Sequence, residues 1–317
     1  MEGTDRRVAN SAQLIMTEVT KAIAGKNDVL IWVMCAIFAK GHILLEDIPG
    51  VGKTTMALAF SKTMGLSCNR VQFTPDVLPS DVTGYSVLNQ KTGELSYQRG
   101  AVLCNLFLAD ELNRATSRTQ SALLEAMEEG QVTVDGISHK IPTPFTVIAT
   151  QNPTGAAGTQ LLPDSQMDRF MVRLSLGYPD AQAEAEMVTS RQKGNPLHTI
   201  VQAMTAEELS QLQQMVADTY VSPDVVNYIV SLIAATRNHP MILRGASPRA
   251  TLAVTAMAKA CARLRGRDFV IPEDVQGVLV NTLSHRLLLS AAAETKNISA
   301  RQLLAGILTS VKAPQLR

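Results

Sequence analysis

The stretch Gly41–Thr55 combines residue types that bind phosphate. It reads GHILLEDIPGVGKTT, in which a short apolar run enters a glycine-containing turn and Gly52, Lys53 and Thr54 open a helical pattern. This is the layout of a P-loop, in which backbone N–H groups point at the phosphates and Lys53 neutralises the β- and γ-phosphate oxygens. The Thr54 hydroxyl is then placed to ligate Mg²⁺. A chance Gly-Lys-Thr at a strand-to-helix turn is the alternative.

One position departs from the strict P-loop pattern. That pattern has glycine where this chain has Asp47. Gly50 and Gly52 remain, so the tight turn and the close approach of the backbone to a phosphate are still available.

A pair of acids follows a second apolar run. Leu106–Ala109 is wholly apolar and ends in Asp110 and Glu111. In a P-loop ATPase, Asp110 would hold the Mg²⁺ shell and Glu111 would activate the attacking water. Solvated acids at the end of a strand are the alternative, but the place of this pair, after a P-loop and at the same sheet edge, favours nucleotide hydrolysis.

Three polar residues further along fit the same chemistry. Asn152 follows an apolar run and could orient a water through its amide, although an Asn before a proline also forms turns. Arg169 suits an arginine finger given to a neighbouring subunit, or a salt bridge with Asp164 or Asp168. Arg249 lies in the first turn of a helix, where the helix dipole disfavours a cation, so a γ-phosphate or a nearby acid should offset it.

Composition narrows the class of protein. The 317 residues carry a net charge of +1 and few aromatic side chains, which gives no bulk signature for nucleic acid or membrane binding. Four scattered cysteines form no Cys-x-x-Cys pair, and the N-terminus lacks a signal-peptide pattern. The longest apolar run, Val29–Ala39, is too short to cross a bilayer. We therefore expect a cytoplasmic protein with no direct membrane insertion.

The first half of the chain alternates strands and helices. Five segments are predicted to be strands, at 43–45, 69–73, 102–109, 145–150 and 171–176. Helices are predicted at 8–23, 28–38, 53–64 and 117–129. Such alternation predicts an α/β fold with a parallel sheet whose site lies at the carboxyl ends of the strands.

Two predicted hairpins interrupt this alternation, and the second half changes character. One hairpin lies in the polar insertion 74–100, and the other, 131–141, turns at Asp135-Gly136. After about residue 180 only helical patterns follow, at 181–192, 206–219, 223–238, 248–264, 272–283 and 300–311. We therefore expect two domains, 1–179 and 180–317, the second all-α with no strand.

The motifs taken together resemble those of the AAA+ ATPases, and more narrowly the MoxR family in the helix-2-insert clade. The resemblance rests on six stretches that cover essentially the whole chain: LLEDIPGVGKT (44–54), LFLADELNRA (106–115), TQSALLEAMEEGQVTVDG (119–136), IATQNP (148–153), DSQMDRF (164–170) and RGASPRA (244–250). Asp47 is common in this family.

The resemblance implies a role for each matched position. ATP would be bound by Gly25 at the adenine pocket and by Pro49, Gly50, Val51, Gly52, Lys53, Thr54 and Thr55. Asp110 and Glu111 would be the Walker B pair, with Thr54 and Asp110 at Mg²⁺. Asn152 matches sensor 1, Arg169 the arginine finger and Arg249 sensor 2, with its action in cis or in trans left open. Arg114 is a weaker candidate at the interface. Segments 74–100 and 131–141 resemble the helix-2 insert and the pre-sensor-1 insert.

The resemblance also implies an assembly and a role. A finger supplied in trans needs head-to-tail contacts, which close into rings, and hexamers are the family expectation. Such motors resemble chaperone-like remodelling or maturation factors that act with a von Willebrand factor A-domain partner on client proteins.

Three other functions share parts of this pattern. A nucleic-acid translocase of the same clade would want a cationic hairpin tip, and 131–141 carries Asp135 there. A magnesium-chelatase-like motor subunit shares the fold, and RGASPRA argues against it only through family likeness. A non-hydrolysing scaffold is disfavoured because Lys53, Asp110, Glu111 and Arg169 are all present.

Overall fold

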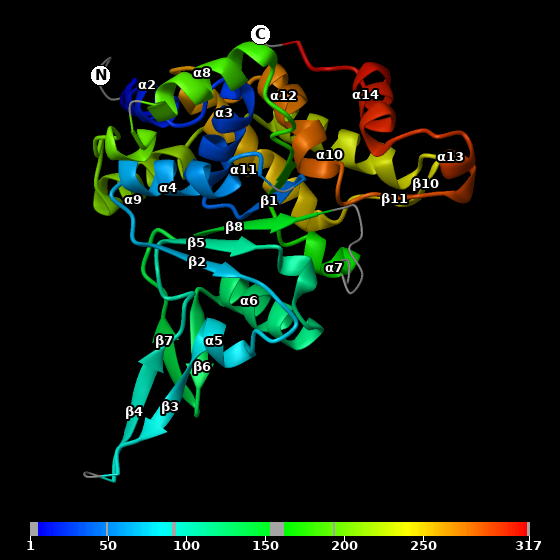
Figure 1. Ribbon diagram of the computed structural model, residues 1–317. Coiled ribbons are helices and arrows are strands. Elements are labelled where there is room, and N and C mark those ends of the chain that lie inside the picture. The colour runs from blue at the N-terminus through cyan, green and yellow to red at the C-terminus, as the bar shows by residue number, and fades with distance from the viewer. Residues whose placement is uncertain (1–5, 49, 91–92, 153–161, 193, 316–317) are drawn as a thin grey trace.

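A five-stranded parallel sheet forms the centre of the computed structural model, which describes residues 6–48, 50–90, 93–152, 162–192 and 194–315. Its strands are β1 (Ile43–Glu46), β2 (Cys68–Gln72), β5 (Leu106–Asp110), β8 (Thr146–Gln151) and β9 (Val172–Leu174). They lie in the order β2-β5-β8-β1-β9, and every neighbouring pair is parallel (Figure 1). The predicted α/β sheet is confirmed. The third strand is shorter than predicted, since it begins at Leu106 rather than at residue 102.

The two faces of the sheet carry separate hydrophobic cores. Alternate residues of one strand point to opposite faces, so Leu106 and Leu108 join one core, and Phe107 and Ala109 join the other. The first core lies among α2 (Arg7–Val19), α3 (Asn27–Phe38), α4 (Lys53–Thr63) and the C-terminal helices. The second lies under α5 (Pro79–Thr83) and α6 (Ser117–Glu129).

Two hairpins extend from the side of α5 and α6 (Figure 1). They are β3 (Gly84–Leu88) with β4 (Leu95–Arg99), and β6 (Gln131–Val134) with β7 (Ile137–Lys140). The second turns where predicted, because Asp135 and Gly136 both adopt positive φ, 49° and 78°. The rings of Tyr97 and His139 stack with centroids 3.6 Å apart, which ties the two hairpins together at their base.

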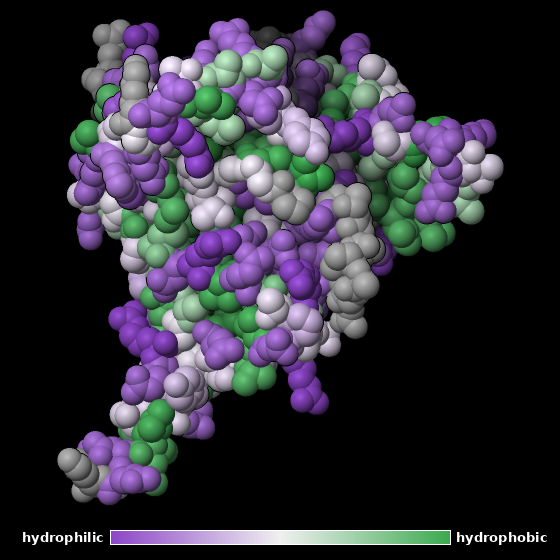
Figure 2. Space-filling model, in the orientation of Figure 1, coloured by the Kyte–Doolittle hydropathy of each residue, from purple (hydrophilic) through white to green (hydrophobic). Residues whose placement is uncertain are grey.

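The β3–β4 hairpin carries exposed apolar side chains. Val87, Leu88 and Leu95 are all exposed, and Leu88 pairs directly with Leu95 across the strands. Figure 2 shows this apolar surface on the projecting part of the molecule.

The C-terminal part is a helical lid, as predicted, with one correction. Its helices are α8 (Ala181–Gln192), α9 (Ala206–Ala217), α10 (Pro223–Arg237), α11 (Pro248–Leu264), α12 (Pro272–Leu283), α13 (Ala291–Thr295) and α14 (Ala300–Ser310). The expected absence of strands is wrong, because β10 (Ile242–Arg244) and β11 (Leu288–Leu289) pair in a small antiparallel sheet. Such short strands have no periodicity of their own and exist through this pairing.

Local sequence explains where the lid helices begin. Ser222 and Ser247 each precede a proline, and their hydroxyls accept hydrogen bonds from the backbone N–H of Val225 and Ala250. A serine N-cap followed by proline at the first helical position satisfies the helix start.

The C-terminal helices pack closely on the α/β domain. Buried residues of α3, such as Leu30 and Val33, share one hydrophobic cluster with Val254 and Met257 of α11. In the part of the chain that the structure describes, no helix is long and apolar enough to span a membrane.

Candidate active site

The sheet order brings the predicted phosphate-binding and hydrolytic residues to one edge. β8 lies between β5 and β1, and all three run in the same direction. The P-loop follows β1, Asp110 ends β5 with Glu111 next, and Asn152 follows β8. Their carboxyl ends therefore meet, as the fold class requires for a ligand site.

The P-loop has the backbone that its glycines predict. Gly50 and Gly52 adopt positive φ, 84° and 95°, a region that side chains disfavour. Gly52 caps α4, so Thr54 and Thr55 lie in the first turn of the helix, whose N–H groups have no intrahelical acceptor. Val51 lies beside them, half-buried. Pro49, also predicted to contact ATP, lies outside the described residues.

Lys53 is held inside this loop. Its Nζ donates to the carbonyl oxygens of Asp47 at 3.1 Å and Ile48 at 3.2 Å, and the residue is only 8% exposed. Burial lowers the pKa of the ammonium, while the carboxylates of Asp47, Asp110 and Glu111 act in the opposite direction. Lys53 therefore lies within electrostatic reach of both predicted hydrolytic acids.

Asp47 anchors the P-loop to the segment that leads into the lid. Its carboxylate accepts hydrogen bonds from Ser175 Oγ at 2.8 Å and from the backbone N–H of Leu176 and Gly177 at 2.6 and 2.9 Å. It is buried, and three charge-assisted hydrogen bonds to one carboxylate are strong. The departure from the strict P-loop pattern thus supplies a tie between the P-loop and the end of β9.

The two acids share a partner that the sequence did not reveal. Thr150 Oγ1 donates to Asp110 Oδ1 at 2.7 Å and accepts from the backbone N–H of Glu111 at 2.8 Å. Thr150 is fully buried in β8. Its only signal in the sequence is a hydroxyl near the end of a strand that reads TVIATQ, and Thr146 of the same strand carries a hydroxyl too.

Each acid also pairs with an arginine. Asp110 contacts Arg70 at 2.8 Å, and Glu111 contacts Arg114 at 2.8 Å. Glu111 has φ 56° and ψ 46°, a left-handed conformation that is uncommon and costly for a side chain of this kind. Such strain occurs where surrounding contacts fix a functional side chain.

The predicted Mg²⁺ ligands have suitable chemistry. The Thr54 hydroxyl and the Asp110 carboxylate are hard oxygen donors, which Mg²⁺ prefers, and one or two protein ligands plus phosphates are usual for this ion. Within the described part of the chain no group of three His, Cys, Asp or Glu side chains could by itself hold a metal. The donors therefore fit an ion held jointly with a nucleotide.

Asn152 and Gly25 lie near the carboxyl ends of the strands, Asn152 beside the acids and Gly25 beside the P-loop. The backbone oxygen of Asn152 accepts from Asn113 Nδ2 at 3.2 Å, just beyond the acids. Gly25 has φ 69°, and a side chain there would meet Ala183 of α8 at 2.6 Å. Since Ile23 approaches Gly52, the Gly25 turn lies between the P-loop and the lid.

Arg169 and Arg249 lie at the amino ends of the strands, opposite the carboxyl ends where the P-loop and the two acids lie. The segment after Arg169 joins the amino end of β1, where Met171 N donates to His42 O at 2.8 Å and Val172 pairs with Ile43. The P-loop follows the opposite end of β1.

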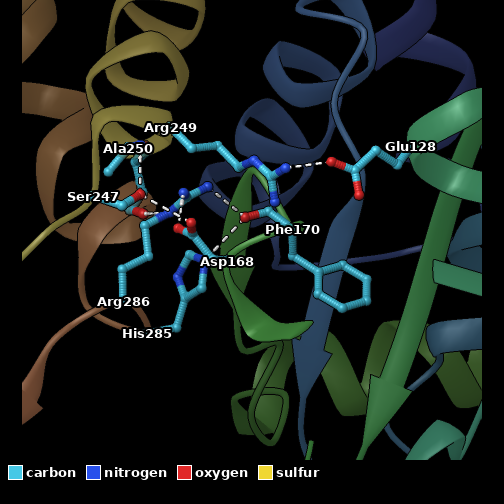
Figure 3. A network of polar contacts seen from close by, with 9 residues as sticks. Glu128, Asp168, Phe170, Ser247, Arg249, Ala250, His285 and Arg286 are labelled. Carbon is cyan, nitrogen blue, oxygen red and sulfur yellow. Dashed lines mark hydrogen bonds and ion pairs between the residues drawn. The ribbon is translucent and has the colours of Figure 1, made fainter. Parts of the chain in front are cut away.

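Both arginines contact one acid, Glu128 of α6. Arg169 Nε lies 3.1 Å from Glu128 Oε2, and the Arg249 guanidinium pairs with Oε1 (Figure 3). The alternative partners considered for Arg169 are wrong, because Asp164 pairs with Arg244 and Asp168 pairs with Arg286. The nearby acid expected for Arg249 is Glu128.

Comparison with known proteins agrees with this arrangement. Residues 42–172 match the family model "ATPase family associated with various cellular activities (AAA)", and residues 234–307 match "AAA lid domain". The uncharacterized protein YeaC of Bacillus subtilis is 44% identical over 94% of this chain and 93% of its own length. Chaperone MoxR1 of Mycobacterium tuberculosis is 37% identical over 94% of this chain and 81% of its own. A crystal structure from Cytophaga hutchinsonii superposes with a TM-score of 0.92 at 36% identity, covering 99% of this chain and 98% of that one.

Proposed function

Since the chain belongs to the MoxR family of AAA+ ATPases, we propose that it hydrolyses ATP at interfaces between identical subunits of a ring and uses the energy to remodel client proteins. In this proposal residues 1–179 form the ATPase core and residues 180–317 form the lid. The ring is a hexamer, by family expectation.

The binding half of the reaction uses the P-loop edge. The N–H groups of the P-loop and of the first turn of α4 receive the phosphates, and Lys53 moves its hydrogen bonds from the loop carbonyls to phosphate oxygens. Gly25 leaves room beside the adenine. Bound Mg²⁺, held by Thr54 and Asp110, would supply charge neutralisation between the phosphates.

The hydrolytic half depends on Glu111 and Asn152. Glu111 accepts a proton from the attacking water, and the Asn152 amide orients that water. Thr150 fixes both the Asp110 carboxylate and the Glu111 backbone, so the metal ligand and the base keep one relative geometry.

The observation that carries the proposal is the separation of Arg169 and Arg249 from the chain's own P-loop. They lie at the amino edge of β1, and this strand of four residues spans about 10 Å at roughly 3.3 Å per residue. Arginines at this edge suit the phosphates of a neighbouring subunit, which supports action in trans for both. Head-to-tail contacts of this kind close into rings.

Remodelling is the role that best fits the rest of the molecule. The β3–β4 hairpin presents Val87, Leu88 and Leu95, an apolar surface suited to protein segments. A von Willebrand factor A-domain partner remains part of the proposal through family likeness.

The alternatives find less support. Asp135 at the tip of the β6–β7 hairpin disfavours a nucleic-acid translocase, because phosphate tracking needs cations. A magnesium-chelatase-like subunit shares the fold but only the general features of the site.

The test follows ATPase rate and particle mass across a protein-concentration series. The proteins are wild type, Glu111→Gln, Arg169→Ala and Arg249→Ala. Specific activity should rise with assembly, and the two arginine variants should bind ATP and assemble but lose at least about 100-fold in kcat, since an arginine finger contributes about 10³ or more.

A concentration-independent activity that survives Arg169→Ala would contradict the ring proposal. Mixing distinguishes cis from trans action. Glu111→Gln subunits have an inactive site but intact arginines, so they should restore hydrolysis at the sites of Arg169→Ala subunits in mixed rings. No restoration in rings shown by mass to be mixed would contradict action in trans.

A further inference from the structure

Among the described residues, Glu128 is the one carboxylate that pairs with both arginines, Arg169 and Arg249. Each of its oxygens pairs with one guanidinium. Oε2 lies 3.1 Å from Arg169 Nε, and Oε1 pairs with Arg249, as Figure 3 shows. The three residues come from α6, the segment before β9, and the first turn of α11. These three elements are distant in the sequence, and the fold brings them together at this contact.

The backbone segments that carry the two arginines are joined by a partly buried network. Asp168, next to Arg169, accepts from Ser247 Oγ at 2.9 Å and pairs with Arg286. Ser247 is also the N-cap of the helix that carries Arg249. The Arg286 side chain is 2% exposed, so Asp168 is anchored by a buried cation.

The side chains of the two arginines are more exposed than the network that anchors their backbone segments. The side chains of Arg169 and Arg249 are 29% and 46% exposed, and two cations lie close together. Without an acid between them they would repel each other and take separate orientations. Ion pairs this exposed contribute little to stability. The effect of Glu128 is therefore on the direction of the guanidiniums rather than on folding.

Open space lies beside the pair. A cavity of about 240 Å³ is lined by Arg169, Arg249, Lys40, Asp168 and Arg286, among others. Four cations lie against two acids, Asp168 of the lining and Glu128 beside it, so this space has an excess of positive charge suited to an anionic group from outside the chain.

We propose that Glu128 is a positioning residue that holds Arg169 and Arg249 as one unit, directed at the phosphates bound by the next copy of the chain. The inference rests on the proposed function in trans. Glu128 also lies two residues before Gly130, which ends α6 and leads into the β6–β7 hairpin. A displacement of that hairpin would therefore shift both arginines together.

The first experiment compares Glu128→Gln with Glu129→Gln in full-length protein. Glu129 is the next residue and is exposed, and among the described residues it makes no ion pair, so it is a matched control for the loss of charge. Misaligned groups cost up to about 100-fold in rate, and we expect Glu128→Gln to lower kcat about tenfold. The KM for ATP and the midpoint of thermal unfolding should change little, and Glu129→Gln should behave as wild type.

The second experiment uses mixed rings. Glu111→Gln subunits keep Glu128 and both arginines, so mixing them with Glu128→Gln subunits should raise activity above that of either variant alone. Wild-type activity in Glu128→Gln, or a loss that Glu111→Gln subunits do not restore, would overturn the positioning role. If Arg169→Ala is restored by the same mixing while Glu128→Gln is not, only this inference fails. If neither is restored, the proposed action in trans fails as well.

Discussion

The Thr150 hydroxyl should matter to hydrolysis because it contacts both predicted hydrolytic acids. It donates to Asp110 Oδ1 at 2.7 Å and accepts from Glu111 N at 2.8 Å, and it is fully buried. Thr150→Val keeps the branched shape on Cβ and so the packing of β8, but removes both hydrogen bonds. The substitution therefore isolates the hydroxyl.

The expected cost follows from these two contacts. A buried polar group left without its partner costs about 1–3 kcal/mol. Asp110 keeps its contact with Arg70, so the larger part falls on the Glu111 N–H, and we expect a loss of about 2 kcal/mol in the free energy of unfolding. Glu111 is also strained by about 1–3 kcal/mol in its left-handed conformation. Without the hydroxyl this strain relaxes and turns the carboxylate from the attacking water.

Activity should therefore fall more than stability suggests. A displacement of about 1 Å at a reacting group costs about 100-fold in rate, so kcat of Thr150→Val should fall about 100-fold with ATP binding retained. Steady-state hydrolysis and urea unfolding measure the two effects. Thr150→Ser, which keeps the hydroxyl, should stay within about threefold of wild type. Equal kcat for Thr150→Val and Thr150→Ser would refute the argument.

Two further predictions concern stability. Asp47→Asn replaces a carboxylate that accepts three hydrogen bonds and should lower the free energy of unfolding by about 2 kcal/mol. Denaturant unfolding measures this loss, with Asp76→Asn, a substitution of an exposed acid, as the control. Equal stability of the two variants would contradict the prediction. Burial, then the charge of Arg286, holds the pKa of His285 well below its usual value, so the unfolded chain takes up a proton below about pH 6.5 that the folded protein refuses. The contribution of His285 to stability should be constant above that pH and fall below it, by about 1 kcal/mol between pH 7.5 and 5.5. His285→Gln should lose that share of the slope, and pH profiles parallel to wild type would exclude it.

Capping and turn motifs in the sequence correctly predicted the features that depend only on neighbouring residues. Ser247-Pro248 begins α11 at the predicted residue, and Asp135-Gly136 turns the second hairpin as predicted. The P-loop glycines adopt the positive φ that their spacing indicated. Each of these depends on neighbours within a few residues, which a single sequence contains.

The contacts that complete the site could not be predicted in this way. Glu128 lies 41 positions before Arg169 in the numbering and 121 before Arg249, and no periodicity links them. Thr150 and Asp110 meet because β8 and β5 are neighbours in the sheet. The short strand β11 likewise forms only because β10 lies beside it. These features depend on tertiary packing, which overrides local preference.

The division of the site between two edges of one sheet has a mechanical consequence. Asp47 ties the P-loop to the end of β9, and Met171 ties the start of β9 to the start of β1. Under the proposed function, a shift of the P-loop on binding phosphate would be transmitted through β1 and β9 to the segment that carries Arg169. The same segment is anchored to the lid by Arg286 and to α6 by Glu128. In the proposed ring, occupancy of one site should thus move the arginines that serve the next, so that successive subunits are coupled through these short connections.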